Sequence, residues 1–413
     1  MMNIPALFRC RSCGSAALSP VVSLGAMPLA NALVTREEIE RGTPIYPLDV
    51  VFCQACSLVQ ITETVPPEEL FGEYLYFSSY STTLLAHAAT LATRLIAERR
   101  LDAGSLVVEL ASNDGYLLRN YAAAGIPVLG IEPARNIARV AVEEHGIPTI
   151  SEFFSTALAA QMAARGERAD LLHAHNVLAH VADLNGFVAG IATVLKPSGI
   201  AVLEMPYVRD MIEKCEFDTI YHEHLCYFSL TALTALFARH GLSIRHVERL
   251  AIHGGSLRIF AGPAAGGSRE ASVEALLADE ASCGLRAATY YQDFGRRVVA
   301  VRDKLLAKLA EIKGQGKTVA AYGAAAKCTV LLNFCAVGPD QIAFVVDANP
   351  HKVGRYVPGV GLPIEPPAKL LESQPDYTLL LVWNIATEVL AQQTEYQRRG
   401  GRFMRVIPEP ELL

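Results

Sequence analysis

The sequence has none of the long apolar runs that would direct this chain to a membrane. Its first ten residues lack the apolar core of a signal peptide, and no stretch reaches the roughly 18 uncharged apolar residues of a membrane span. Basic residues are also few: 36 Lys and Arg stand against 42 Asp and Glu, and they form no stripe that would follow a phosphate backbone. We therefore expect a cytoplasmic protein that binds neither a membrane nor nucleic acid.

A secreted disulfide framework is absent as well. The nine cysteines are an odd number, and only four of them gather near the N-terminus. Because a single core rarely grows beyond about 250 to 300 residues, the 413 residues predict two or three domains. The sequence carries no signal for an oligomer, and we expect a monomer.

Two Cys-x-x-Cys pairs stand out near the N-terminus: Cys10 with Cys13, and Cys53 with Cys56. Four thiolates suffice for a tetrahedral, structural zinc site with no open coordination position. The interval between the pairs is long, and we expect residues 27–49 to form a looped insertion. The alternatives are four unrelated thiols or a redox pair. A redox pair would need a thioredoxin-like βαβ unit, and none follows.

From Ser105 the sequence alternates between buried apolar runs and amphipathic helices, which is typical of a doubly wound parallel sheet. We expect strands over 106–110, 128–131, 169–174 and 200–205, helices over 116–124 and 230–240, and a closing hairpin of strands 243–250 and 256–261. Residues 196–199 read Lys-Pro-Ser-Gly and predict a turn. Ligands of such sheets lie outside the carboxyl ends of the strands.

A second, smaller α/β unit follows a largely helical stretch over 273–313. We expect its strands over 318–322, 342–347 and 377–383. The backbone amides of the loop 323–327, together with Lys327, would suit a diphosphate at a helix N-terminus. A tight turn of small residues that lets the helix pack closely explains the loop equally well. We expect domains over 1–75, 76–268 and 269–413.

The first loop of the central sheet, Ala-Ser-Asn-Asp-Gly over 111–115, lacks the Gly-x-Gly-x-x-Gly spacing that admits a dinucleotide pyrophosphate. The next strand ends in Glu132, whose carboxylate would accept hydrogen bonds from both ribose hydroxyls. A nucleoside without phosphates, such as S-adenosylmethionine, fits this combination. The alternative is a plain α/β sheet with an incidental acidic strand end.

The densest group of ionisable residues is Tyr221-His222-Glu223-His224. Its histidines are two residues apart and do not share a helical face as in a zinc protease, so a catalytic metal is the weaker interpretation. A histidine could instead remove a proton from a carbon beside a ketone, while a carboxylate fixes its tautomer and Tyr221 donates to the enolate oxygen. The alternative is a polar loop whose histidines bond backbone carbonyls.

Taken in order, these motifs resemble the sugar C-methyltransferases of deoxysugar biosynthesis over essentially the whole chain. The resemblance rests on the two Cys-x-x-Cys pairs and on segments 76–80 (Tyr-Phe-Ser-Ser-Tyr), 109–116, 130–133, 176–180, 221–224, 252–256 and 322–327. It implies an α/β protein with an N-terminal zinc-binding module and a central Rossmann-like methyltransferase domain, whose parallel sheet ends in an antiparallel hairpin. A degenerate Rossmann-like domain would follow at the C-terminus.

The resemblance also assigns residues to roles. It implies structural Zn²⁺ on the four cysteines, and His224 as the catalytic base with Glu223 and Tyr221. It implies S-adenosylmethionine bound by Tyr76, Glu109, Ser112, Asp114, Gly115, Glu132 and Asn176, and a nucleotide-linked keto sugar bound by His222, His253, Tyr322 and Lys327. Two residues depart from the family pattern: His175 where a second Asn is expected beside Asn176, and Cys328 where Gly usually follows the Lys.

The implied reaction moves a methyl group from S-adenosylmethionine to C3 of a dTDP-linked 4-keto-6-deoxysugar, through an enolate formed by neutral His224. The carrier nucleotide stays open between dTDP, GDP and CDP. One rival is an O- or N-methyltransferase, whose acceptor atom needs no carbon acid to be ionised. The others are a C-methyltransferase of a non-sugar ketone and a non-catalytic zinc-ribbon scaffold.

Overall fold

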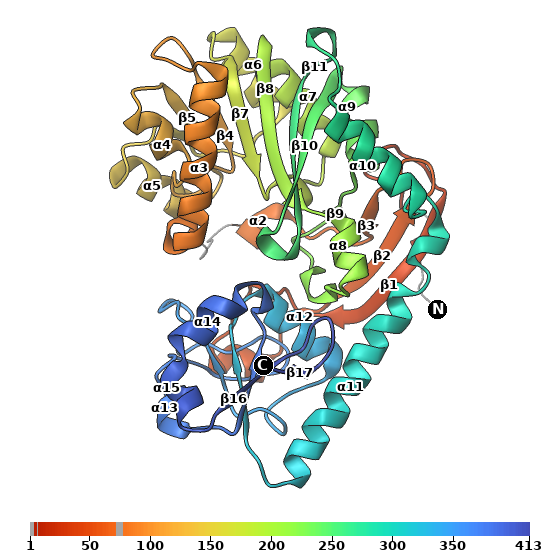
Figure 1. Cartoon of the computed structure of the whole chain (residues 1–413), viewed down its shortest axis with the longest axis vertical. Helices are drawn as coiled ribbons and strands as arrows, with labels where there is room; N and C mark the ends of the chain where they lie inside the picture. The colour runs from red at the N-terminus through yellow and green to blue at the C-terminus, as the bar shows by residue number, and fades with distance from the viewer. Residues whose placement is uncertain (1–3, 6, 72–76) are drawn as a thin grey trace.

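The computed structural model describes residues 4–5, 7–71 and 77–413, which form three sheets. In Figure 1 the central part, in yellow and green, lies above the blue C-terminal part, and the red N-terminal strands lie beside them with the long helix α11 (Phe294–Gly314). Within the described ranges, no helix is both long and apolar enough to cross a bilayer.

The N-terminal module is an antiparallel sheet in the order β1-β2-β3-β9. Its elements are β1 (Leu18–Met27), α1 (Arg36–Arg41), β2 (Tyr46–Cys53), β3 (Val59–Ile61), α2 (Pro67–Phe71) and, from far along the chain, β9 (Cys226–Tyr227). The expected looped insertion over 27–49 contains regular structure, because Met27 pairs with Tyr46 and α1 begins after its capping residue Thr35.

The central sheet has the order β10-β11-β8-β7-β4-β5-β6. Its strands are β4 (Val107–Leu110), β5 (Val128–Ile131), β6 (Thr149–Ile150), β7 (Ala169–His175), β8 (Leu195–Pro206), β10 (Leu242–Leu250) and β11 (Ser256–Pro263). Strands β4 to β8 are parallel, and β10 and β11 form an antiparallel hairpin at one edge. This confirms the predicted doubly wound sheet with its terminal hairpin.

Helices cover both faces of the central sheet, which is why its middle strands are continuous apolar runs. The helices of the central part are α3 (Thr82–Arg99), α4 (Leu118–Ala123), α5 (Arg135–Glu143), α6 (Thr156–Ala164), α7 (Leu184–Val194), α8 (Val208–Glu213) and α9 (Leu230–Arg239). Side-chain caps begin four of them, at Ser81, Ser155, Asp183 and Ser229.

The predicted turn over 196–199 lies inside β8. Ala169 of β7 pairs with Leu195, whereas Leu171 pairs with Ile200, so the four residues form a bulge. A Pro and a Gly two residues apart predicted a turn, but the strand continues because its pairing with β7 resumes after the bulge.

The C-terminal sheet has the order β14-β13-β12-β15-β16-β17 and is parallel except for β17. Its strands are β12 (Val319–Tyr322), β13 (Val345–Val346), β14 (Ile364–Glu365), β15 (Tyr377–Leu380), β16 (Arg402–Arg405) and β17 (Glu411–Leu412). The remaining helices are α10 (Ala271–Ser282), α12 (Ala326–Cys335), α13 (Lys369–Ser373), α14 (Ala386–Gln392) and α15 (Thr394–Arg398). Two expected strands are shorter than predicted, at β13 and β15.

The three parts pack against one another. Helices α11 and α12 contact β1, and α10, which follows the expected boundary at 268, packs against β10 and α9. One hydrophobic cluster includes Phe52, Phe237 and Leu331, which come from the three different parts. The ends of the three sheets are therefore held in a fixed relation by shared apolar contacts.

Candidate active site

The two Cys-x-x-Cys pairs form matching turns. Gly14 N donates to Cys10 O at 2.8 Å, and Ser57 N donates to Cys53 O at 2.9 Å. Gly14 and Ser57 both have left-handed backbones, with φ of 74° and 61°. Two similar turns therefore present their thiols from opposite sides.

The four thiols converge. All four Sγ atoms lie within 4.8 Å of one another, with Cys10 and Cys56 at 3.5 Å and Cys13 and Cys53 at 3.6 Å. Four sulfurs at about 2.3 Å from a central zinc ion would stand roughly 3.8 Å apart, so the residues fit a structural Zn²⁺. Hydrogen bonds with Cys53 and Cys56 lower the pKa of the Cys10 thiol, whereas the hydrogen bond with Cys10 raises the pKa of both Cys53 and Cys56, so Cys10 is favoured as the thiolate among these three.

The loops after β4 and β7 are strained where the methyl donor is expected. Ala111, Asn113 and Asn176 all have positive φ, at 53°, 50° and 53°. Such conformations cost energy in residues other than glycine and persist where the surroundings hold them, which is common at ligand sites. The sequence did not predict these conformations, although asparagine adopts a positive φ more readily than most residues do.

Most of the side chains expected to bind S-adenosylmethionine stabilise the conformation of these loops. Glu132 accepts from Asn113 N and Ala134 N, each at 2.9 Å, so each oxygen keeps one lone pair for a ribose hydroxyl. Asp114 accepts from Ser79 N at 3.1 Å. These contacts anchor the segment next to Tyr76, which itself lies outside the described residues.

Ser112 and Gly115 of the loop after β4, and Glu109 of β4 itself, are buried. A Cβ on Gly130 would lie 2.5 Å from Ser112 Oγ, so Ser112 packs against β5 and needs a glycine opposite. Gly115 has φ of 79° and touches Ile147. Burial, and then the charges of Glu132 and Asp114, raises the pKa of Glu109 well above its ordinary value. A cationic ligand such as S-adenosylmethionine would relieve this accumulation of carboxylates.

The segment 221–224 leads directly into β9, the edge strand of the N-terminal sheet. Leu225 O accepts from Ile61 N at 3.0 Å, and Leu225 N donates to Ala179 O at 2.8 Å. Because β9 pairs with β3, the zinc-bearing module positions the segment from one side and the loop after β7 positions it from the other. The sequence did not predict this pairing, since β3 and β9 are far apart in the chain.

His224 and Tyr221 form a pair. His224 Nδ1 lies 3.0 Å from Thr219 O, and its Nε2 lies 2.8 Å from Tyr221 Oη. Because a carbonyl only accepts, Nδ1 carries the proton, and Nε2 accepts from the tyrosine hydroxyl. Burial, and then the neighbouring His180, lowers the pKa of His224 well below its ordinary value, so the ring is neutral. The His180 ring stands edge-on to it at 4.8 Å between centroids, a neighbour that the sequence did not reveal.

Glu223 does not orient His224, and that expectation is wrong. Both nitrogens of the His224 ring bond other groups, and Glu223 Oε1 accepts from Asn31 Nδ2 at 2.7 Å. Glu223 is 3% exposed. The carboxylate therefore ties the segment to the N-terminal module.

The stability that Glu223 contributes should depend on pH. Burial raises the pKa of Glu223 to about 7, so the folded protein favours its protonated form. That contribution is full below the pKa of an exposed glutamate, about 4.3, and is lost as the pH rises through about 7. Glu223→Gln stays neutral, and we expect its stability relative to the natural protein to rise by on the order of 2 kcal/mol between about pH 5 and pH 8. Urea unfolding at both pH values measures this difference, and an equal difference at both would contradict the assignment.

His222 is structural, which corrects its assignment to the substrate. It is 1% exposed, and its Nε2 lies 3.1 Å from Pro47 O and 3.3 Å from Tyr46 O. Nε2–H of His222 therefore donates to a backbone carbonyl. The alternative interpretation of the segment as a polar loop expected this bond for its histidines. His222 therefore fastens the segment to β2.

The central and C-terminal parts meet beside this segment. Trp383 Nε1 donates to Asp218 Oδ2 at 2.7 Å, and Lys327 Nζ lies 5.4 Å from the centre of the Trp383 ring. Gly254, next to His253, has no room for a Cβ because Trp383 and Glu216 stand there. Trp383 and Glu216 were missed, because nothing in their own sequence neighbourhoods places them together.

Lys327 and His253 lie at the same contact between the central and C-terminal parts, which we call the seam. Burial lowers the pKa of Lys327, against the opposing charges of Asp218 and Glu216. Burial, and then the charge of Lys327, lowers the pKa of His253 to about 4. Lys327 also lowers the pKa of His224, so these side chains share one electrostatic environment.

Tyr322 and Cys328 are both buried. Tyr322 is 4% exposed and packs in the C-terminal core with Ala320 and Leu380, which corrects its assignment to the substrate. Cys328 is fully buried, so it adds no side chain to the neighbouring loop. The amide of Ala324 donates to Asp347 Oδ2 at 2.8 Å, so one of the amides expected to receive a diphosphate already has an acceptor.

Comparison with known proteins gives consistent matches along the chain. Family profiles match a zinc binding domain over residues 10–71, a methyltransferase domain over 84–247 and a C-methyltransferase C-terminal domain over 251–408. C-methyltransferase NovU of Streptomyces niveus is 37% identical over 405 residues, which are 98% of this chain and 96% of that protein.

Other similarities are partial. A ubiquinone biosynthesis O-methyltransferase of Methylobacterium sp. (strain 4-46) is 35% identical over 101 residues, covering 24% of this chain and 39% of that protein. Magnesium protoporphyrin IX methyltransferase (ChlM) from Synechocystis PCC 6803, solved with bound SAM, has a TM-score of 0.34 and 15% identity, covering 47% of this chain and 88% of that chain.

The seven-stranded sheet, the strained loops at its carboxyl edge and the four-cysteine cluster together define a zinc-binding, S-adenosylmethionine-dependent methyltransferase. Its relationship to NovU spans nearly the full length of both proteins, and the matching C-terminal profile is that of a C-methyltransferase C-terminal domain. The chain therefore belongs to the C-methyltransferase family. Membership of this family excludes the two alternatives of an O- or N-methyltransferase and a non-catalytic zinc-ribbon scaffold.

Proposed function

We propose that the acceptor is a nucleotide-linked 4-keto-6-deoxysugar, with dTDP as the carrier, and that C3 is methylated through an enolate. The observation that carries this proposal is the state of His224: a neutral ring whose Nδ1–H is held by Thr219 O and whose Nε2 is unprotonated. An unprotonated nitrogen beside a tyrosine hydroxyl suits removal of a proton from a carbon next to a ketone.

In the proposed mechanism, Nε2 of His224 removes the C3 proton, and the Tyr221 hydroxyl turns from the ring to donate to the enolate oxygen at C4. Bound S-adenosylmethionine supplies the methyl group, so a C–C bond forms at C3 as the C–S bond breaks. His224 keeps the proton until it passes to water. Zinc takes no part, because four thiolates leave it no open position.

A nucleotide carrier is supported by the C-terminal α/β sheet. The loop after β12 brings Lys327 to the seam, where it shares the electrostatic environment of His224 and His253. A small free ketone would not need this second sheet beside the base. The order of the three domains therefore favours an acceptor with a sugar at His224 and a nucleotide toward the C-terminal part.

A substrate panel tests this function. The enzyme is incubated with S-adenosylmethionine and 4-keto-6-deoxysugars carried by dTDP, GDP or CDP, with simple ketones alongside, and products are analysed by mass spectrometry. We expect a gain of one methylene on the dTDP sugar. Methylation of a simple ketone with none on any nucleotide sugar would overturn the proposal.

A further inference from the structure

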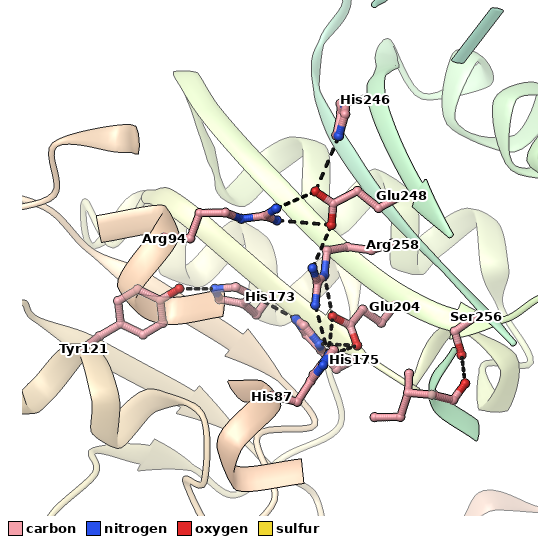
Figure 2. Close-up of polar contacts among 11 residues, drawn as sticks. His87, Arg94, Tyr121, His173, His175, Glu204, His246, Glu248, Ser256 and Arg258 are labelled. Carbon is pink, nitrogen blue, oxygen red and sulfur yellow. Dashed lines mark hydrogen bonds and ion pairs between the residues drawn. The ribbon is translucent and has the colours of Figure 1, made fainter. Parts of the chain in front are cut away.

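A row of polar side chains links α4, β7 and β8 next to the loop after β7 (Figure 2). Tyr121 Oη lies 2.8 Å from His173 Nε2, and His173 Nδ1 lies 2.9 Å from His175 Nε2. His175 Nδ1 lies 3.4 Å from Glu204 Oε2. We call these four residues the histidine relay. It joins α4 to β7 and β8, and it gives His175, a departure from the family pattern, two partners.

Glu204 is a fixed anion at the end of the relay. It is 2% exposed, and its carboxylate accepts from Arg258 Nε at 2.6 Å and contacts His87 Nε2 at 3.0 Å. Although burial raises the pKa of Glu204, the charge and hydrogen bond of His175, the bond from His87 and the charge of Arg258 hold that pKa well below its ordinary value. Glu204 therefore stays ionised and keeps one orientation.

The anion sets the direction of every bond in the relay when His175 is neutral. A carboxylate only accepts, so His175 Nδ1–H points to Glu204, and its Nε2 accepts from His173 Nδ1–H. His173 is neutral because burial lowers its pKa well below the ordinary value, and its Nε2 accepts from the Tyr121 hydroxyl. With His175 neutral, each ring is thus held in one tautomer and one position.

The relay ends beside a strained residue. Asn176 follows His175 directly and has φ of 53°, and its N–H donates to Glu204 O at 2.8 Å. Glu204 therefore holds this loop twice, through its backbone oxygen at Asn176 and through its carboxylate at His175. A left-handed asparagine keeps that conformation where its surroundings leave no alternative.

We propose that His175, held between His173 and Glu204, is a positioning residue that keeps Asn176 in the conformation that receives S-adenosylmethionine. The inference rests on the assignment of the Asn176 loop to the methyl donor. An asparagine at position 175 would be too short to span the two partners, so the histidine supplies a support that a shorter amide would not.

The test measures S-adenosylmethionine binding to the full-length protein by calorimetry. His175→Phe keeps the ring and removes both bonds, and we expect the Kd to rise about tenfold or more. His175→Gln can accept from His173 through its amide oxygen and donate to Glu204 through its amide nitrogen, and we expect a Kd within about threefold of the natural protein. The KM of the acceptor should stay within about twofold in both variants, because the relay lies behind the donor loop.

A second variant guards against a folding defect. Glu204→Asp keeps the charge opposite Arg258 but withdraws the carboxylate from His175, and we expect it to weaken donor binding as His175→Phe does. His246→Phe is the matched control, because His246 bonds Glu270 and Ser272 at the outer edge of the network, away from Asn176. We expect it to leave the Kd unchanged.

Three results would overturn the inference: an unchanged Kd in both His175→Phe and Glu204→Asp, a Kd for His175→Gln as high as that of His175→Phe, or an equal rise in the acceptor KM. Failure of the natural protein to bind S-adenosylmethionine would be a different outcome. It would contradict the methyl-donor site itself, and the positioning role of His175 with it.

Discussion

Replacing His224 by asparagine should lower turnover by roughly 10²- to 10⁴-fold, while the Kd of S-adenosylmethionine stays unchanged. Asparagine keeps a polar side chain of similar reach and can donate to Thr219 O, but it has no basic nitrogen to accept the C3 proton. The loss should therefore fall on kcat, because the base acts in the transition state rather than in binding. Steady-state kinetics and calorimetry on the same preparations measure both quantities.

Proton exchange separates the base from the methyl transfer. In deuterated water, the natural enzyme should exchange the C3 proton of the keto sugar, and His224→Asn should not. Tyr221→Phe should slow exchange less, because it removes the donor to the enolate oxygen and leaves the base in place. The exposed His351 offers a matched control, and His351→Asn should behave as the natural enzyme. Near-normal turnover and exchange in His224→Asn would show that another group is the base.

Removal of zinc should abolish turnover and destabilise the protein together. Binding of a structural zinc ion releases about 10 to 16 kcal/mol in small zinc domains, as much as the whole stability of a typical domain. The effect should reach the active site because β3 of the zinc-bearing sheet pairs with β9, which directly follows His224. Chelation, or Cys10→Ser, should therefore lower the melting temperature and displace the base.

The measurement combines metal analysis, thermal unfolding and turnover on one sample. We expect one zinc ion per chain in the natural protein and a loss of all three signals in Cys10→Ser. Cys283 lies outside the four-thiol cluster, so Cys283→Ser is the matched control and should keep its zinc and its turnover. A chelated protein that keeps its melting temperature and its turnover would contradict a structural role for the metal.

Much of the candidate site could be predicted because its residues are local in the chain. The four cysteines, the loop after β4 and the segment 221–224 each carry their chemistry within a few residues, and the structure gathers the four thiols as expected. The predictions that were wrong concern the hydrogen-bond partners of these side chains. Glu223 was expected to hold His224 because it is adjacent, but it bonds Asn31, 192 residues away in the chain. His222 was expected to face substrate, but it bonds carbonyls of β2.

The contacts that could not be predicted join distant segments. Trp383 with Asp218, and β3 with β9, depend on how the three sheets pack, and neither segment of each pair signals the other. The relay through His173, His175 and Glu204 lies on two adjacent strands and depends on their register. A shift of one residue in that register would turn these side chains to the other face of the sheet.

The sequence by itself determined the fold class and the zinc ligands, because strand periodicity and cysteine spacing are local properties. Only the tertiary structure decided which groups bond His224 and which histidine bonds the carbonyls of β2. Hydrogen-bond partners are selected by distance in space, and burial then sets which protonation state each group keeps. Both follow from packing among elements far apart in the chain.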